Sequence, residues 1–476
     1  MKAHRGNAGN GGQAGNLKRQ LGLFDAAMIL CGIVIGSGIF TSTGLMAEYL
    51  PSPGWILAVW LAGGLLTLAG ALTFAELGAA LPRAGGHYVY LHEAFGPLWG
   101  FLCGWILFLV YMSGGIAALA AAFSEYLGGL WPAVSRDRIL LNLDLIPGSR
   151  NFFWRVSAAQ LAAVIAIQAL TWVNWLGVRQ GKWVQNILTV IKIGVLIGLA
   201  GLGLISSRGQ AISWDWNCAG MSPVGLLMAC GTGLVAVSWA FDGWNNVNFT
   251  AGEIRDPQRT LPRALLLGTV GVTLLYLLVN LVYFRALPLA QMAGQVRVAD
   301  LAAVALFGDR VGNLLAGAII VSILGSLNGS ILTGPRIYFA MARDGLFFRQ
   351  AGRVHPHNGT PSRAILLQGA WASLLAVTGT FSQLFTFVMF VSILFWIAAA
   401  GAVIRLRRTR PDLARPYRVP GYPWVPILFM AASAAILVSS LLENPVESLA
   451  GLVLTGLGIP VFRAWRGRSI SRSHEG

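Results

Sequence analysis

Long apolar stretches recur along the chain and alternate with short polar segments. An α-helix needs about 20 apolar residues to cross the hydrocarbon core of a bilayer. The pattern therefore predicts twelve membrane-spanning helices, and their even number puts both chain ends on the same side of the membrane. The predicted spans are residues 22–48, 54–80, 97–127, 153–174, 184–205, 222–252, 263–286, 311–341, 364–379, 384–405, 423–441 and 446–462.

The first predicted span is interrupted near its middle by the stretch GIVIGSGIF, residues 32–40. A glycine inside a helix costs about 1 kcal/mol relative to alanine, and unpaired backbone groups are costly in hydrocarbon. The run Gly36-Ser37-Gly38 therefore favours a true break whose free backbone groups face a polar guest. Tight helix packing through Gly32 and Gly36, which are four residues apart, is the alternative.

The sixth predicted span is interrupted in a similar way by WAFDGWN, residues 239–245. A charged residue near the centre of a bilayer costs at least about 2.5–3.5 kcal/mol on insertion scales. Asp242 is therefore expected to face a cavity or a partner group. Trp239 is large enough to cover a small bound molecule. An aromatic packing cluster is the alternative interpretation.

The two interrupted spans correspond to each other if the first ten spans form two sets of five. Since five is odd, the second set enters the membrane from the opposite side, and paired glycine-interrupted segments of such inverted repeats point to a substrate site. Amides at the N-terminus of a half-helix suit a carboxylate. Unwound carbonyls in the other break suit an ammonium group. Together the two breaks predict a site for an α-amino acid.

Lys192 lies within the fifth predicted span, in the apolar run TVIKIGVL. One interpretation is a side chain that extends to the membrane interface. The other is a buried ammonium that tethers the fifth span to the broken first span and occupies space where a sodium ion would otherwise sit. A buried lysine also loses or gains its proton readily, so a link to proton movement stays open.

Composition and charge fit a membrane protein better than a soluble one. Hydrophobic residues make up 56% of the chain and charged residues 11%, with a mean hydropathy of +0.67, whereas a soluble domain carries about 25% charged residues. The net charge of +16 would suggest nucleic acid in a soluble protein. Here 25 of the 34 Lys and Arg residues fall on the side of the termini, so the termini are predicted to be cytoplasmic. The densest basic block, residues 405–418, is interpreted as a positive-inside anchor.

The remaining polar residues show no enzyme motif. The four cysteines have no CxxC or Cys/His spacing, so no metal site, cofactor or disulfide framework is expected. Acidic residues near span ends are expected at the membrane interface, and the histidines of the loops are expected to be solvated. These residues are Asp25, Glu76, Glu125, His87, His92, His355 and His357.

At this point several motifs, taken in order, resemble those of the amino acid–polyamine–organocation superfamily, and most closely its L-type amino acid transporter branch. The resemblance covers roughly residues 20–460. The matching segments are GIVIGSGIF (32–40), ELGAALPRAGGHYVYLHEAFGPLWGF (76–101), TVIKIGVL (189–196), WAFDGWNNVNF (239–249), LPRAL (261–265), RIYFAMARDGLF (336–347), TPSRA (360–364) and RPYRVPGYPWVP (415–426).

The resemblance implies an all-α polytopic membrane protein with a LeuT-like fold. Two inverted five-helix repeats, in which helices 1 and 6 are discontinuous, would be followed by two C-terminal helices. The implied segments are a disordered cytoplasmic tail (1–20), the first repeat (21–205), the second repeat (222–408), helices 11 and 12 (423–462) and a second cytoplasmic tail (463–476).

The resemblance also implies roles for individual residues. The backbone of Ile35, Gly36, Ser37 and Gly38 would bind the substrate carboxylate. The carbonyls of Trp239, Ala240 and Phe241 would hold the α-amino group, with the Trp239 side chain as an aromatic gate. Asn245 would be a polar residue below the site, and Lys192 would replace a sodium site. Asp242 and Gly243 of the second break are also predicted to bind the substrate.

We therefore expect a sodium-independent amino acid transporter of the inner or plasma membrane, an exchanger or facilitator that works by alternating access. Alternatives are a proton-coupled amino acid or polyamine symporter and a non-transporting amino acid sensor. Expected partners are the amino acid and the lipid bilayer, with no nucleic acid. Because the loop at 131–152 has no cysteine, no disulfide-linked heavy chain is expected, and the protein would be a monomer or homodimer.

Overall fold

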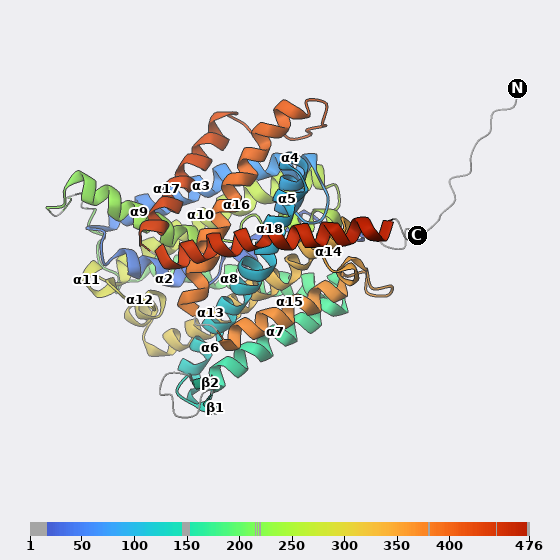
Figure 1. Cartoon of the computed structure of the whole chain (residues 1–476). Helices are drawn as coiled ribbons and strands as arrows, with labels where there is room; N and C mark the ends of the chain where they lie inside the picture. Colours follow the sequence, from blue (N-terminus) through green and yellow to red (C-terminus); the bar gives the residue numbers. More distant parts are fainter. Residues whose placement is uncertain are drawn as a thin grey trace, which may run out of the picture.

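The predicted apolar spans fold into long helices in a computed structural model, which describes residues 17–144, 153–214, 216, 218, 220–378, 381–443 and 445–473 (Figure 1). The helices within the predicted spans are α1 (Leu23–Val34), α2 (Gly38–Met46), α3 (Pro53–Ala80), α5 (Pro97–Ile106), the π-helix η1 (Leu107–Met112), α6 (Ser113–Leu130), α7 (Ala158–Leu176), α8 (Val178–Ile205), α9 (Pro223–Ala240), the 3₁₀-helix η3 (Asn246–Glu253), α10 (Pro257–Ala286), α13 (Asp309–Thr333), α14 (Pro335–Arg343), α15 (Ser362–Thr378), α16 (Phe381–Thr409), α17 (Trp424–Glu443) and α18 (Pro445–Ser473).

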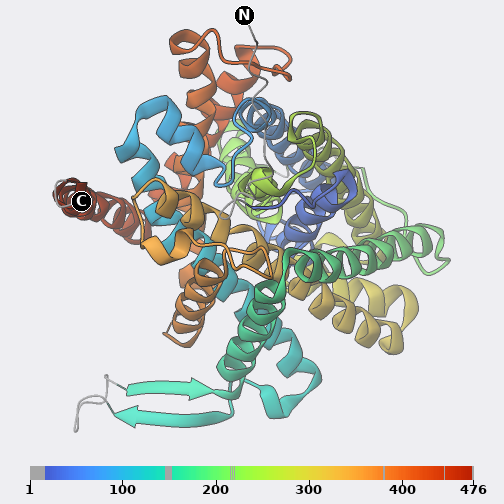
Figure 2. The same ribbon diagram turned by 90° about the vertical axis from the view of Figure 1, so that its right-hand side faces the viewer.

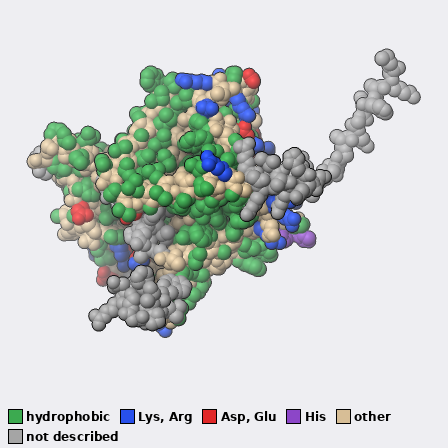
Figure 3. Space-filling view, viewed as in Figure 1, with side chains coloured by type: hydrophobic (Ala, Val, Ile, Leu, Met, Phe, Trp, Pro, Cys, Tyr) green, Lys and Arg blue, Asp and Glu red, His purple; other side chains and the backbone are tan. Residues whose placement is uncertain are grey.

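These helices confirm the predicted polytopic helical fold. Among the described residues, ten helices or continuous helix pairs are long and apolar enough to cross a membrane, and the bent pair α1 and α2 makes an eleventh. The predicted ninth span corresponds to α15, which has 17 residues. Figure 3 shows hydrophobic side chains over most of one face, as lipid contact requires.

Short elements connect the spans. They are α4 (His87–Phe95), η2 (Pro132–Val134), β1 (Ile139–Asp144), β2 (Phe153–Ser157), α11 (Leu289–Met292), α12 (Val298–Phe307) and η4 (Arg349–Gly352). The start of the described chain and the end of α18 lie at one end of the molecule, which we call the terminal face (Figure 1). The predicted tail at 1–20 lies outside the described residues up to residue 16, and α18 continues as a helix through the predicted tail to Ser473.

An antiparallel ribbon of two strands was not predicted. Strands β1 and β2 pair between α6 and α7 and project sideways from the helices (Figure 2). The predicted fourth span began at residue 153, but the helix begins at Ala158. The reason is a capping box at Ser157, whose amide donates to Gln160 Oε1 at 2.8 Å while its hydroxyl accepts from the Gln160 amide at 3.3 Å.

The core surrounds the first broken span. Helix α1 packs against α8, α10 and α13, so its side chains from Ile29 onward are buried. At the terminal face, the carboxylate of Glu253 at the end of η3 forms a two-pronged ion pair with Arg336 of α14, at 2.8 and 3.0 Å. Both side chains are buried. Removing one partner of such a pair typically costs about 3–5 kcal/mol, so this contact holds η3 firmly against α14.

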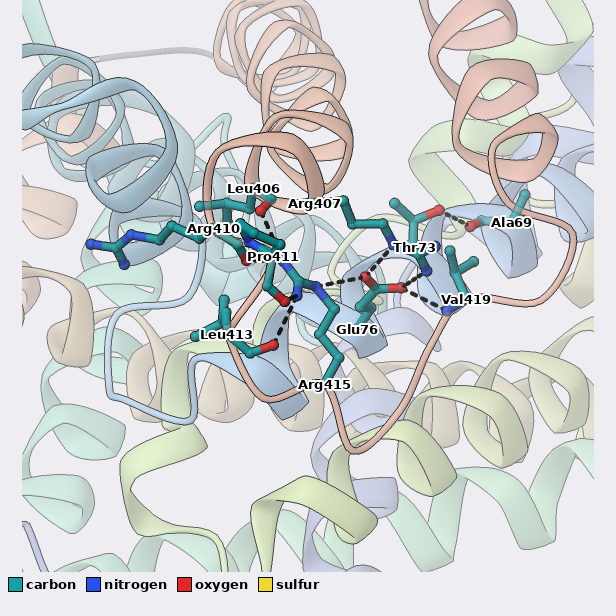
Figure 4. A network of polar contacts seen from close by, with 10 residues as sticks. All are labelled: Ala69, Thr73, Glu76, Leu406, Arg407, Arg410, Pro411, Leu413, Arg415 and Val419. Carbon is teal, nitrogen blue, oxygen red and sulfur yellow. Dashed lines mark hydrogen bonds and ion pairs between the residues drawn. The ribbon is translucent and has the colours of Figure 1, made fainter.

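The basic block at 405–418 does more than anchor the chain to the membrane. Glu76, at the end of α3, is buried and accepts hydrogen bonds from Arg407 and from the amide of Val419 (Figure 4). Arg415 forms an ion pair with the same carboxylate at 3.6 Å and donates to four backbone carbonyls of the block. Glu76, which was expected at the membrane interface, is thus buried and paired, and its carboxylate organises the loop between α16 and α17.

His87 is also buried, which makes the prediction of a solvated loop histidine wrong. Its ring packs edge-on against Phe74 and Phe249, at centroid distances of 4.9 and 5.0 Å. Neither ring nitrogen has a hydrogen-bond partner among the described residues. Burial lowers the pKa of His87 to about 3, from an ordinary value of 6.5.

This burial predicts a specific sensitivity to acid. Because the unfolded chain binds the His87 proton more tightly, its contribution to stability is full above about pH 6.5 and falls as the pH drops toward 3. A His87→Phe variant fits the aromatic surroundings and is expected to lose less apparent melting temperature between about pH 7 and about pH 4.5 than the wild type. Melting in detergent across this range measures the difference, and equal acid sensitivity would contradict the prediction.

Candidate functional site

The first break is a short non-helical segment between α1 and α2. Helix α1 ends at Val34, helix α2 begins at Gly38, and the two helices are bent by 40°. A helix end leaves its last carbonyls and the next helix leaves its first amides without intrahelical partners. The break therefore exposes acceptors from α1 and donors from α2 at the same depth.

The protein supplies hydrogen-bond donors to the carbonyls of Gly32 and Ile35 at the end of the first half-helix. The ammonium of Lys192 is buried and donates to the carbonyls of Gly32 (2.8 Å) and Ile35 (2.7 Å), and also to Ser322 of α13 (2.6 Å). The hydroxyl of Ser326 donates to the same two carbonyls of the break. Lys192 thus connects α8, the break and α13, and its side chain does not extend to the interface.

The donors of α2 are left open. The backbone amides of Ser37 and Gly38 donate no hydrogen bond to any of the described residues. These two amides stand at the N-terminus of a nine-residue helix. The positive end of the helix dipole and the free N–H groups together favour an anionic group such as a carboxylate.

The second break lies between α9 and η3. Helix α9 ends at Ala240, and the turn that follows contains Gly243 with a positive φ of 89°. The carbonyl of Trp239 accepts from the amide of Asp242 at 3.0 Å. This break leaves one carbonyl, that of Phe241, without a donor among the described residues.

The two breaks touch each other through glycines. A Cβ atom on Gly38 would lie 2.5 Å from the Cα atom of Ala240, and a Cβ atom on Gly243 would lie 2.2 Å from the Ile33 side chain. Atoms cannot approach this closely without a shift of the structure. Glycine is therefore required at both positions so that the two broken spans can meet.

One hydroxyl lies between the ends of the two broken helices. The hydroxyl of Tyr276 in α10 lies 2.9 Å from the carbonyl of Val34 and 3.0 Å from the carbonyl of Ala240. These are the last helical residues of α1 and α9. The hydroxyl has one hydrogen, so it donates to one carbonyl at a time. Tyr276 therefore links the C-terminal ends of α1 and α9 and fixes their relative positions.

A cavity opens where the breaks meet η1, α6 and α13. Its polar wall includes Asp242, whose Oδ1 accepts a hydrogen bond from the Tyr111 hydroxyl at 3.0 Å. The same hydroxyl lies 3.3 Å from Oδ1 of Asn246. The cavity is lined by Ile33, Val34, Gly36, Ser37, Gly38, Tyr111, Met112, Gly115, Leu119, Trp239, Asp242, Asn246 and Ser330.

Half of the residues predicted for substrate binding line this cavity. Those in contact with it are Gly36, Ser37, Gly38, Trp239 and Asp242, whereas Ile35, Ala240, Phe241, Gly243 and Asn245 lie behind its lining. The ring of Phe241 packs against Trp60 and Tyr276. The amide group of Asn245 is buried without a partner among the described residues, and the next residue, Asn246, reaches the cavity instead.

Sequence reasoning missed the wall formed by the third and eighth spans. Tyr111 and Met112 lie on the π-helix η1, and Gly115 and Leu119 follow on α6. A π-helical turn inside an α-helix often occurs at a functional site because it changes which side chains face inward. The pair Gly114-Gly115 was a local signal. Nothing local indicated Tyr111, whose role depends on tertiary contacts with the second break.

Among the described residues, no group of three or more His, Cys, Asp or Glu side chains is placed to hold a metal ion. The cavity instead combines backbone donors, a carboxylate and an aromatic cover. Such a set of groups is suited to hold a small zwitterion by hydrogen bonds and charge.

Comparison with known proteins identifies the family of this chain. The model of the amino acid permease family matches residues 21–455. The chain is 32% identical to the serine/threonine exchanger SteT of Bacillus subtilis over 96% of this chain and 98% of that protein. It is 32% identical to the human large neutral amino acids transporter small subunit 2, over 96% and 82% of the two chains.

A third relative is the b(0,+)-type amino acid transporter 1 of Mus musculus, with 30% identity over 90% of this chain and 84% of that protein. These matches confirm the resemblance drawn from the motifs. The chain belongs to the amino acid permease family within the amino acid–polyamine–organocation superfamily, and it is an amino acid transporter.

Proposed function

We propose that this transporter is a sodium-independent exchanger or facilitator that carries its amino acid by alternating access. The observation that carries the proposal is the pair of open amides, at Ser37 and Gly38, on a cavity whose other wall holds the Asp242 carboxylate. The amides bind the substrate carboxylate, and the ammonium lies toward Asp242 and the second break. The name of one relative, a serine/threonine exchanger, supports exchange.

The position of Lys192 supports sodium independence. Its ammonium is fully coordinated by backbone oxygens of α1 and α13 and by the hydroxyl of Ser326. A sodium ion prefers a similar set of oxygen ligands, and the ammonium already fills that space with its own positive charge. We propose that Lys192 performs the structural role that a coupling ion performs in sodium-driven transporters.

The proposed location is an inner or plasma membrane, with the terminal face in the cytoplasm. The support is the excess of Lys and Arg on that face. The relatives are transporters, so an enzymatic activity is not proposed. The segment 131–152 contains no cysteine, so we propose a monomer or homodimer without a disulfide-linked heavy chain.

Uptake of labelled amino acids into proteoliposomes tests this function. We expect uptake that persists when sodium is replaced by choline, and acceleration by internal amino acid indicates exchange rather than facilitated diffusion. Concentrative uptake driven by a pH gradient alone would favour the alternative, a proton-coupled symporter. Binding without uptake would favour a sensor, and the absence of any uptake would overturn the proposal.

The contact between the breaks predicts the effect of a single methyl group. Gly38→Ala places a Cβ atom against the backbone of Ala240 and is expected to reduce uptake of every amino acid by about tenfold or more, because overpacking of this kind costs about 1–3 kcal/mol. Gly194→Ala, on an open surface of α8, is the matched control and is expected to behave as the wild type. Loss of transport of only some substrates in the Gly38 variant would contradict the proposal that backbone groups of the two breaks bind the part that all amino acids share.

Substitution of Gly115 is expected to affect substrates selectively, whereas substitution of Gly38 affects all of them. It lines the cavity, and a Cβ atom added to it would have no neighbouring atom within 4 Å. Gly115→Val therefore narrows the space for the substrate side chain without disturbing the breaks. We expect the apparent affinity to fall for amino acids with large side chains and to change little for alanine or serine. A uniform loss across a panel of substrates would show that Gly115 does not face the substrate side chain.

The shared hydroxyl of Tyr276 predicts a uniform loss of transport. Tyr276→Phe leaves the Ala240 carbonyl without a donor among the described residues, and a buried unpaired group costs about 1–3 kcal/mol. We expect exchange to fall by about tenfold for all substrates. Tyr283→Phe is the control, since this hydroxyl lies about two turns further along α10 and its hydrogen bond, at 3.4 Å, goes to the Ile39 carbonyl and to neither end carbonyl of the broken helices. Equal rates in the two variants would contradict the positioning role.

A further inference from the structure

A second cavity lies on the terminal face, separate from the amino acid site. It has a volume of about 650 Å³ and opens between the segment before α1, the loop after α3 and the end of α14. Small-molecule sites typically have volumes of about 300–1,000 Å³ and combine an apolar lining with a few placed polar groups. Val89 and Phe339 supply apolar lining here. The cavity therefore has the size and character of a ligand site.

The charged groups around this cavity are mainly positive. Arg19, Arg83 and Arg343 line it from three different segments, together with one carboxylate, Asp344. Asp344 accepts a hydrogen bond from the Tyr88 hydroxyl at 2.7 Å, and Arg83 forms an ion pair with Glu93 outside the lining. The cluster remains positive when Glu93 is included. Arginine has five donors, so Arg83 keeps free donors while paired, and guanidinium groups match phosphate and carboxylate oxygens.

The walls of the cavity belong to elements that contact each other at the terminal face, and we call this arrangement closed. The amides of Gln20 and Leu21, next to Arg19, donate to the carbonyl of Glu253 at 2.8 and 2.9 Å. The carboxylate of Glu253 in turn binds Arg336, two turns before Arg343 on α14. The cavity thus spans the segment before the first broken helix, the end of the second broken helix and the eighth span.

We propose that this cavity binds a soluble phosphate-bearing anion from the cytoplasm, and that the bound anion holds the terminal face closed. An anion that bridges Arg19 and Arg343 binds only while the two segments are close together, so it shifts the population toward the closed state. Release of substrate into the cytoplasm requires the broken helices to separate from α14. The anion therefore slows exchange. This inference rests on the proposed alternating access and on the cytoplasmic position of the terminal face.

Inorganic pyrophosphate is the probe for the experiment. Exchange is measured in proteoliposomes of neutral lipid with pyrophosphate on both sides, against chloride at equal ionic strength. We expect pyrophosphate to slow wild-type exchange several-fold and to have no effect on an Arg19→Ala/Arg343→Ala double variant. Arg349→Ala, an exposed arginine of the same face that does not line the cavity, is the control and is expected to stay inhibited.

Binding is measured separately from transport. Pyrophosphate is expected to raise the melting temperature of the wild type and of the Arg349 variant, but not of the double variant. This readout tests the site even if no amino acid is transported, so failure of the proposed function and failure of this site are distinguishable. The same melting shift in the double variant, or no shift in the wild type, would overturn the proposal.

A lipid headgroup carries the same phosphate chemistry, and a lipid arm distinguishes the two sources. Exchange is compared in neutral vesicles and in vesicles that contain phosphatidylglycerol, without pyrophosphate. Exchange that is unchanged by phosphatidylglycerol supports a soluble anion. Inhibition by phosphatidylglycerol that disappears in the double variant would overturn the soluble source and assign the site to a lipid headgroup.

Discussion

The structure depends on how unpaired backbone groups are satisfied where a membrane span is broken. No water is available in hydrocarbon, so every freed carbonyl and amide needs a partner within the protein or on a ligand. At the first break the protein supplies partners for the carbonyls of Gly32, Val34 and Ile35 through Lys192, Ser326 and Tyr276. It supplies none for the amides of Ser37 and Gly38 among the described residues. This asymmetry is the physical basis for the proposal that the cavity binds a carboxylate.

In the proposed site, two different sets of protein groups face the two parts of an amino acid. One set faces the carboxylate and ammonium, and the other faces the side chain. In the proposed binding mode, backbone groups of the breaks contact the carboxylate and the ammonium, which all α-amino acids share. Side chains of the third and eighth spans, such as Leu119 and Ser330, form another part of the cavity wall. Because these two sets come from different helices, residues such as Leu119 and Ser330 can be substituted without any change in the backbone groups of the two breaks.

The sequence was sufficient for features that follow from local composition. Apolar runs predicted the spans, and glycine runs with a charged residue predicted the two breaks. Lys192 was identified because a lysine in an apolar run requires a partner or an interface. Of the predicted binding residues, Gly38 and Asp242 line the cavity, whereas Asn245 does not, because the turn of the second break directs Asn246 there instead.

Features that depend on distant partners were not predictable from a single sequence. Tyr111 and Tyr276 are ordinary aromatic residues in apolar spans until the fold places their hydroxyls against Asp242, Val34 and Ala240. Burial of His87 and Glu76 depends in the same way on Phe249 and Arg407, which lie far along the chain. The hydrophobic pattern of the sequence indicates how deep in the membrane a residue lies. It does not specify which other helix packs against that residue.

The most direct test of this binding mode is competition by analogues of an amino acid that lack either the carboxylate or the ammonium group. Binding of a labelled transported amino acid to the purified protein is measured against its decarboxylated amine and its deaminated acid. If the Ser37 and Gly38 amides bind the carboxylate and the opposite wall binds the ammonium, the unlabelled amino acid competes and each analogue is weaker by about a hundredfold, since each loses a charge-assisted contact of about 1.5–3 kcal/mol. A decarboxylated amine that competes as well as the amino acid would contradict the account.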